Sequence, residues 1–213
     1  MTDLDLETVG TWARAELDRK NAAREQALRW SRELVRTSAT SIRAVHRHDF
    51  AAASELLSEA HALNGRICAA LGEFGDLYWA GYVQDAQKEL VEACCTFALV
   101  TCAALPDPAE LGIAPAAFLN GLGEAVGEVR RYLLDLLRRG EADGCERLLG
   151  FMDDIYGLLV TLDYPDALTG GLRRTTDNTR GILEKTRGDL TLALRQEALV
   201  AALQAVERSV GDS

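Results

Sequence analysis

The stretch GYVQDAQKELVEACCTFALV (81–100) spaces its apolar and polar side chains with the period of an α-helix. On a helical wheel, Leu90, Val91 and Phe97 fall on one side, which we interpret as the side that faces the core. The polar side is a separate stripe that comprises Tyr78, Tyr82, Asp85, Glu89, Glu92 and Thr96. The pattern predicts one long helix from about Gly75 to Ala104, with a buried face and an accessible face.

The same helical period extends through the rest of the chain. The sequence has only four prolines, and β-branched residues never alternate over the length of a strand. Further helices are predicted at about 5–47, 50–72, 116–139, 143–162 and 167–210, with a break near 19–21 and a kink at 170–171 as alternatives. The segment LPDPAELGIAP (105–115) is the clearest linker. These features predict an all-α bundle of six or seven long helices, forming a single domain over 1–213.

The composition is that of an ordinary globular protein, with 48% hydrophobic and 26% charged residues. The formal net charge of −10 excludes a surface that is basic all round, but it allows a local basic patch. No apolar run approaches the ~18 residues of a membrane span, and the acidic start MTDLDLETVG (1–10) is unlike a signal peptide. We therefore expect a cytoplasmic protein with no membrane partner.

The predicted N-terminal helix carries a stripe of arginines. Arg29, Arg32, Arg36, Arg43 and Arg47 fall within about 60° of one another on a helical wheel, apart from the apolar residues. Such a stripe is about 27 Å long at the rise of an α-helix, and it can follow a phosphate backbone. The alternative is a solvated helix face that forms salt bridges with another helix.

Two acidic pairs stand out. Glu89 and Glu92 are i, i+3 neighbours on one helix, where like charges repel unless a cation or an arginine lies between them. Carboxylate oxygens suit Mg²⁺ or Mn²⁺, although most such pairs are simply solvated. Asp153 and Asp154 interrupt the apolar run RLLGFMDDIYGLLV (147–160), where burial is unfavourable unless the carboxylates are partnered or face a cavity.

The helix predicted at 116–139 adds a mixed stripe of Glu124, Glu128, Arg131 and Asp135. A stripe of alternating charge normally forms ion pairs between helices. Carboxylates offered by several helices of one bundle are nevertheless what a metal site requires.

Several familiar chemistries lack their motifs. No Glu lies three residues before any of the histidines, His46, His48 and His61, so a di-iron site with Glu-x-x-His motifs is not expected. The sequence contains neither a P-loop nor a G-x-S-x-G nucleophile motif. The five cysteines form no Cys-x-x-Cys pair, so we interpret them as small buried side chains.

Three blocks, in order along the chain, carry a family resemblance. They are GYVQDAQKELVEA (81–93), FLNGLGEAVGEVRR (118–131) and RLLGFMDDIYGLLV (147–160), with a weaker fourth at SIRAVHRHD (41–49). They resemble the translin family, especially the translin-associated factor X (Trax) branch and its prokaryotic homologues. The family has a Glu-aromatic-Val-Glu-Ala core, an aromatic-Leu-x-Gly run followed by Gly/Ser-Glu-x-x-Arg, and an acidic residue before an aromatic. The likeness covers about residues 24–200.

This resemblance implies a curved, translin-like helical subunit that assembles into a closed shell, usually an octamer. Such shells bind single-stranded RNA or DNA, and Trax-like subunits cleave single-stranded RNA with Mg²⁺ held by carboxylates. The family's catalytic and metal-binding acids fall on Glu89, Glu92 and Asp154, with Asp153 as the alternative if the register slips by one. Glu128 would complete the metal site or orient Arg131.

We therefore expect a homo-oligomeric, metal-dependent endoribonuclease that acts on single-stranded RNA, with Mg²⁺ as cofactor and Mn²⁺ as a substitute. The arginine stripe and Arg131 would hold phosphates, and Tyr78 or Tyr82 would stack on bases. Leu90 replaces the family's usual aromatic and Lys88 its usual Gln, and neither change removes a ligand. The alternatives are a shell that binds single-stranded RNA or DNA without cutting it, and a structural or regulatory helical scaffold.

Overall fold

The computed structural model describes residues 5–211, so the ends of the predicted 1–213 domain, 1–4 and 212–213, lie outside the described part. Within it, all regular secondary structure is helical, which confirms the predicted all-α class. The six long helices are α1 Leu6–His46, α2 Phe50–Leu71, α4 Tyr82–Thr101, α6 Pro115–Arg138, α7 Cys145–Val160 and α9 Leu172–Gly211. Three single-turn helices, α3 Gly75–Tyr78, α5 Pro108–Leu111 and α8 Asp166–Thr169, lie in the connections.

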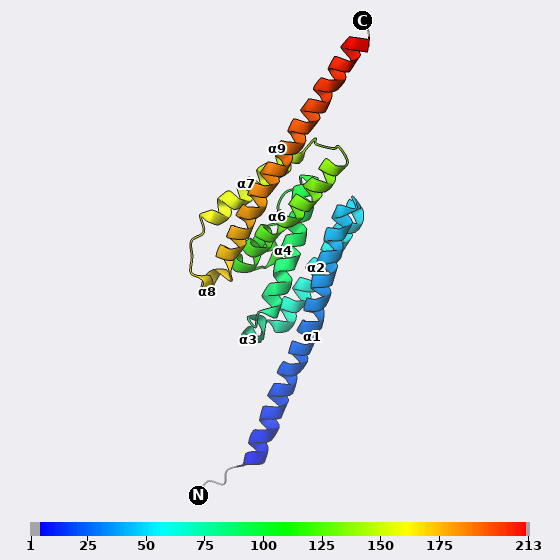
Figure 1. The fold of residues 1–213 in the computed structure, drawn as a ribbon. Helices are drawn as coiled ribbons and strands as arrows, with labels where there is room; N and C mark the ends of the chain where they lie inside the picture. Colours follow the sequence, from blue (N-terminus) through cyan, green and yellow to red (C-terminus); the bar gives the residue numbers. More distant parts are fainter. Residues whose placement is uncertain (1–4, 212–213) are drawn as a thin grey trace.

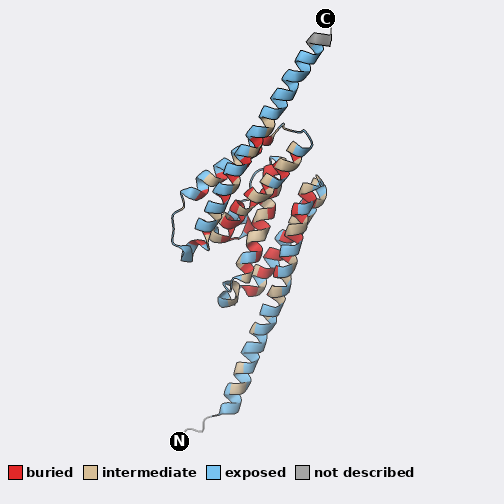
Figure 2. Ribbon diagram, in the orientation of Figure 1, coloured by how far each residue is buried: buried red, intermediate tan, exposed pale blue. Residues whose placement is uncertain are grey.

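The helices form a layered bundle (Figure 1). α1 and α2 are an antiparallel pair, α4 packs against both of them, α6 packs against α4, and α7 and α9 cover the other side of α6. The first part of α1 and the last part of α9 extend beyond opposite ends of the bundle, where they are exposed (Figure 2). No helix in the described part of the chain is long and apolar enough to cross a membrane.

Two predicted boundaries differ from the structure. α1 continues without interruption through residues 19–21, because none of these residues is a helix breaker and ion pairs from Arg19 to Glu73 and from Lys20 to Asp76 tie this region to the start of α3. The helix predicted at 75–104 is instead divided into α3 and α4.

The division between α3 and α4 is a turn built on Gly81. Gly81 has a φ of 94°, a left-handed conformation that favours glycine. Gln84 holds the turn from the first turn of α4, because its Nε2 donates to the carbonyl oxygen of Tyr78 at 2.8 Å and its Oε1 accepts from the N–H of Gly81 at 3.2 Å. Trp79 follows α3 directly and is left on the surface of this turn.

The predicted kink at 170–171 is a complete break. Gly170 and Gly171 both have positive φ, at 58° and 88°, and the N–H of Gly171 donates to Asp166 Oδ1 at 2.8 Å. This geometry ends α8 and redirects the chain into α9, which packs along α6 in the same direction, with Thr175 beside Asn120 and Asp189 beside Arg130.

Two glycines of α6 allow its neighbours to approach its backbone. A Cβ at Gly121 would lie 2.5 Å from the carbonyl oxygen of Lys88 and 2.8 Å from Cβ of Val91, both on α4. A Cβ at Gly123 would lie 2.5 Å from Cγ2 of Thr175 on α9. Because real Cβ contacts are never this short, α6 can pack this closely on α4 and α9 only through these glycines.

The close packing at Gly121 gives a test of the fold. We expect Gly121→Ala to lower the free energy of unfolding by about 1–3 kcal/mol, because the added methyl group meets the α4 backbone rather than a flexible side chain. Gly65→Ala on the exposed side of α2, where no atom lies within 4 Å of the added Cβ, is the matched control and is expected to raise stability by about 0.5–1 kcal/mol. Urea unfolding measures both changes, and a neutral Gly121→Ala would contradict the packing described.

Candidate metal centre

A cluster of three carboxylates lies where α4 meets α6. Glu89 and Glu92 come from α4 and Glu124 from α6, and one oxygen atom of each lies within 4.8 Å of the others. All three side chains are half-buried. Glu89 and Glu92 are the two acids that the sequence singles out, whereas the sequence places Glu124 only in a stripe expected to form ion pairs.

The cluster raises the pKa of its own members. Burial raises the pKa of Glu92 to about 8, and the negative charges of Glu89, Glu124 and Glu128 add to the shift. The pKa of Glu89 is raised as well, first by burial and then by the charges of Glu124 and Asp85, against the opposing effect of Lys88. Carboxylates held together at this proximity form a site with an unbalanced negative charge, which favours a bound cation.

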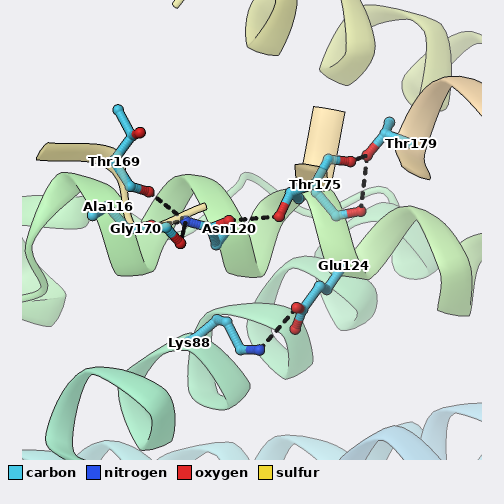
Figure 3. A network of polar contacts seen from close by, with 9 residues as sticks. Lys88, Ala116, Asn120, Glu124, Thr169, Gly170, Thr175 and Thr179 are labelled. Carbon is cyan, nitrogen blue, oxygen red and sulfur yellow. Dashed lines mark hydrogen bonds and ion pairs between the residues drawn. The ribbon is translucent and has the colours of Figure 1, made fainter. Parts of the chain in front are cut away.

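The positively charged side chain of Lys88 lies at the edge of the cluster. Lys88 Nζ donates to Glu124 Oε1 at 2.8 Å, which ties α4 to α6 beside the carboxylates (Figure 3). Burial alone would lower the pKa of Lys88, but the hydrogen bond to Glu124 and the nearby acidic charges outweigh it and raise that pKa. A single lysine leaves two of the three carboxylates of the cluster without a cationic partner among the residues described.

Glu128, expected to complete the metal site or to orient Arg131, has a different principal partner. His46 at the end of α1 donates from Nε2 to Glu128 Oε2 at 2.5 Å, and Arg131 lies 3.8 Å from the same oxygen. The hydrogen bond from His46 holds the pKa of Glu128 below its usual value. Glu128 nevertheless lines a cavity of about 270 Å³ together with Glu92 and Glu124, so it borders the cluster.

The structure does not bring Asp154 or Asp153 into the cluster. The buried face of α7 is formed by Leu148, Met152, Ile155 and Leu159. Asp154 lies on the exposed side of that helix, outside the carboxylate group, and Asp153 is exposed and forms an ion pair with Arg187 of α9 at 2.9 Å. Helical spacing places both aspartates off the buried face of α7, so within one chain Glu124, and not Asp154, is the third carboxylate beside Glu89 and Glu92.

The predicted arginine stripe is exposed along its whole length, at Arg29, Arg32, Arg36, Arg43 and Arg47. Only Arg36 has an acidic partner within the part of the chain that the structure describes, Glu33 at 3.8 Å. Arg32 lines a shallow hollow of about 300 Å³ with Tyr82 and Asp85 of α4, which places the stripe beside the helix that carries Glu89 and Glu92. The stripe is therefore available to phosphate groups rather than occupied by interhelical ion pairs.

The two predicted stacking tyrosines are less accessible than expected. Tyr78 is half-buried and its hydroxyl accepts a hydrogen bond from Gln87 Nε2 at 3.1 Å. The hydroxyl of Tyr82 is buried without a hydrogen-bond partner in the described residues, and burial raises the pKa of this group. The exposed aromatic side chain of this region is Trp79, which the sequence analysis does not single out.

A polar network around Asn120 fixes the opposite side of the site. Asn120 Nδ2 donates to the carbonyl oxygens of Ala116 and Thr169, both at 2.8 Å, and Asn120 Oδ1 accepts from the Thr175 hydroxyl at 2.6 Å (Figure 3). These bonds hold the end of α8 and the start of α9 against α6, one helical turn before Glu124. The network thereby fixes the position of α9 relative to the carboxylates.

Comparison with known proteins gives one sequence relative and several structures. No protein-family model matches the chain. An uncharacterized protein of Methanocaldococcus jannaschii is 31% identical over 194 residues, which cover 90% of this chain and 85% of that protein.

Among solved structures, AfC3PO in a complex with duplex RNA matches with a TM-score of 0.82 and 35% identity, over 91% of this chain and 98% of that chain. A crystal structure of AfC3PO gives a TM-score of 0.81 with the same identity and coverage. Apo-NeC3PO, at 20% identity and a TM-score of 0.77 over 91% of this chain and 98% of that chain, shares the fold.

The raised pKa of Glu92 predicts how stability without metal depends on pH. A carboxyl whose pKa is higher in the folded state than in the unfolded state stabilises the fold at low pH, and this contribution is lost as pH rises through the folded value. We therefore expect wild-type protein in EDTA to lose stability between about pH 5 and the pKa of about 8, relative to Glu92→Gln. At pH 8.5 the variant should be more stable by at least about 1 kcal/mol.

Urea unfolding at several pH values measures this difference. Glu55→Gln, an exposed carboxylate on α2, is the control and should follow the wild-type pH profile. Parallel profiles for wild type and Glu92→Gln would show that the pKa of Glu92 is not raised in the folded protein.

Proposed function

This chain belongs to the translin family as a C3PO-like prokaryotic member, and from this premise we propose that it is a metal-dependent endoribonuclease that cleaves single-stranded RNA inside a homo-oligomeric shell. The observation that carries the proposal is the meeting of Glu89, Glu92 and Glu124 within 4.8 Å. A nuclease of this kind needs carboxylates from more than one element of a rigid scaffold, and α4 and α6 supply them.

The donor set fits Mg²⁺, with Mn²⁺ as a substitute. Three carboxylates offer hard oxygen ligands, and the cluster contains no sulfur or imidazole donor. Burial, together with the charges of the neighbouring carboxylates, raises the pKa of Glu92 to about 8. Glu89, Glu92 and Glu124 would hold the ion, and Glu128 borders the same cavity. When bound, the ion would lower the pKa of a coordinated water and offset the charge that develops on the scissile phosphate.

The chain's own side chains have separate tasks around this centre. Lys88 lies beside Glu124 and would offset part of the phosphate charge from the α4 side. His46 fixes Glu128 by a short hydrogen bond, so that Glu128 keeps its negative charge next to the cluster. The stripe of Arg29, Arg32, Arg36, Arg43 and Arg47, with Arg131 on α6, would hold phosphates of the strand on the side of α1.

RNA as the ligand is supported by AfC3PO, which is 35% identical to this chain and whose structure is known in a complex with duplex RNA. Single-stranded RNA is the proposed substrate because the translin-family resemblance implies it, and single-stranded DNA is a second ligand of the same chemistry. Assembly is supported by exposed apolar side chains at the two projecting ends, such as Leu6 and Trp12 on α1 and Leu199 and Leu203 on α9. We propose that these ends pack between copies in a closed shell of eight subunits.

Substitution of the carboxylates tests the activity. Wild-type protein is expected to cleave 5′-labelled single-stranded RNA in Mg²⁺, and cleavage is expected to stop in EDTA. The substitutions Glu89→Gln, Glu92→Gln and Glu124→Gln are each expected to lower kcat/KM by about 100-fold or more. Each variant keeps the size of the side chain and removes a ligand oxygen's charge. Gel analysis of the products with single-turnover rates measures the effect, and circular dichroism checks the fold.

Asp154→Asn distinguishes the two candidates for the third carboxylate. We expect this variant to cleave within about threefold of wild type, because its side chain is exposed on α7 and lies outside the cluster. Loss of cleavage as complete as in Glu92→Gln would instead assign Asp154 to the site, contributed by another copy. Cleavage that persists in Glu89→Gln/Glu92→Gln would refute the site, and wild-type protein that binds RNA but never cuts it would be a binding shell.

A further inference from the structure

A larger cavity, with a volume of about 700 Å³, adjoins the carboxylate cluster. It lies between the turn that precedes α4, the exposed side of α4, the start of α6 and the α8–α9 junction. Its volume falls in the range of pockets that hold a small organic ligand. The residues that line it include Trp79, Lys88, Glu124, Leu168, Arg174 and Asn178.

Trp79 provides a flat apolar surface at one end of this cavity. Its side chain is 63% exposed, and the ring of Tyr78 packs edge-to-face against it with centroids 4.9 Å apart and an interplanar angle of 87°. An exposed tryptophan in contact with only one neighbouring ring keeps a face available for stacking. Leu168, also exposed, lies at the mouth of the same cavity.

A buried hydrogen-bond chain holds this aromatic surface in place. The Tyr78 hydroxyl accepts from Gln87 Nε2 at 3.1 Å, and the same nitrogen donates to Asn64 Oδ1 at 3.0 Å. Asn64 Nδ2 then donates to the carbonyl oxygen of Leu111 at 2.9 Å. Asn64 and Gln87 are buried, so Tyr78 is fixed from the core and Trp79 is positioned before any ligand arrives.

Two polar side chains of α9 line the cavity and have no hydrogen-bond or ion-pair partner in the part of the chain that is described. They are Arg174 and Asn178, which lie one turn apart on the same face. The adjacent Arg173 differs, because it forms an ion pair with Asp163 at 3.4 Å and does not line the cavity. Arg174 therefore offers an unpaired guanidinium, a group suited to phosphate, and Asn178 offers an amide suited to a base edge.

The cavity is continuous with the proposed metal centre. Glu124, Thr175 and Asn178 line both the large cavity and the smaller one that contains Glu92. Along α4, the distance from Tyr82 beside the Trp79 turn to Glu89 is about 10 Å at the rise of an α-helix. A group that stacks on Trp79 would thus lie next to the reacting phosphate and not at it.

From these contacts we infer that the cavity is a subsite for one unpaired nucleotide next to the scissile bond, with its base stacked on Trp79 and its phosphate held by Arg174. This inference rests on the proposed function, which identifies the bound strand as single-stranded RNA. Asn178 contacts the polar edge of the base. The subsite selects an unpaired nucleotide, because a base within a duplex cannot present its face to Trp79. It also fixes which phosphate of the strand reaches Glu89, Glu92 and Glu124.

Binding without cleavage tests the subsite directly. The probe is a 5′-fluorescein-labelled penta-adenylate RNA, titrated with the full-length protein in EDTA and followed by fluorescence anisotropy. We expect Trp79→Ala to raise Kd about 10-fold, through the loss of one base stack, and Trp79→Phe to restore most of the affinity. Arg174→Ala is expected to raise Kd about fivefold. It is the second variant because its side chain is exposed and has no hydrogen-bond or ion-pair partner among the described residues, so its removal is expected to leave the fold intact.

Two matched controls accompany these variants. Arg173→Ala removes the neighbouring charge, and Tyr164→Ala removes an exposed aromatic ring in the connection between α7 and α8 that does not line the cavity, so both are expected to stay within about twofold of wild type. Light scattering on each variant identifies the competing occupant. If Trp79→Ala changes the oligomer size and leaves penta-adenylate binding unchanged, the cavity mouth is a contact between copies and the inference is overturned.

The outcomes separate this inference from the proposed activity. Weaker binding in Trp79→Ala and Arg174→Ala would support the subsite even if no variant or wild-type protein cleaved RNA. If the protein cleaves RNA but both variants bind penta-adenylate with wild-type affinity, the subsite is overturned and the proposed endoribonuclease activity is not. Wild-type protein with no measurable affinity for penta-adenylate would overturn the subsite outright.

Discussion

The close contact between α6 and α4 at Gly121 is the constraint on which the site depends. With no side chain at this position, α6 lies against the carbonyl oxygen of Lys88 and the side chain of Val91. One turn later on α6, Glu124 then faces the exposed side of α4, where it meets Lys88, Glu89 and Glu92. A larger residue at 121 would separate the helices, and the two acids of α4 would lose the third carboxylate.

The close arrangement of Glu89, Glu92 and Glu124 lowers the stability of the metal-free protein. Half-buried carboxylates repel one another, and burial, together with this repulsion, raises the pKa of Glu92 to about 8. The fold tolerates the repulsion because further interactions hold the helices around the cluster: Lys88 pairs with Glu124, His46 with Glu128, and Asn120 with the α8–α9 junction. A bound divalent cation would attract all of these carboxylates. The same geometry therefore destabilises the metal-free protein and favours metal binding.

Helical periodicity was sufficient to predict the long helices and the pairing of Glu89 with Glu92, because both depend on spacing within one helix. It could not identify the third carboxylate, since a helical wheel does not say which face of α6 meets α4. The family resemblance pointed to Asp154, which is exposed on α7 and lies outside the cluster, whereas Glu124 was expected only to form ion pairs. The glycines at 121 and 123 were the available signal for close helix contact. Gly81 likewise signalled the turn that exposes Trp79, which the prediction of one helix over 75–104 passed over.

The proposed function requires that a divalent cation be bound by carboxylates of both α4 and α6. A crystal of the wild-type protein soaked in Mn²⁺, with diffraction measured for anomalous scattering, tests whether such a site exists. We expect an anomalous peak bridged by Glu89, Glu92 and Glu124 and absent from Glu92→Gln crystals treated in the same way. A structure with no peak at this cluster, or with a peak ligated by Asp154 and not by Glu124, would contradict it.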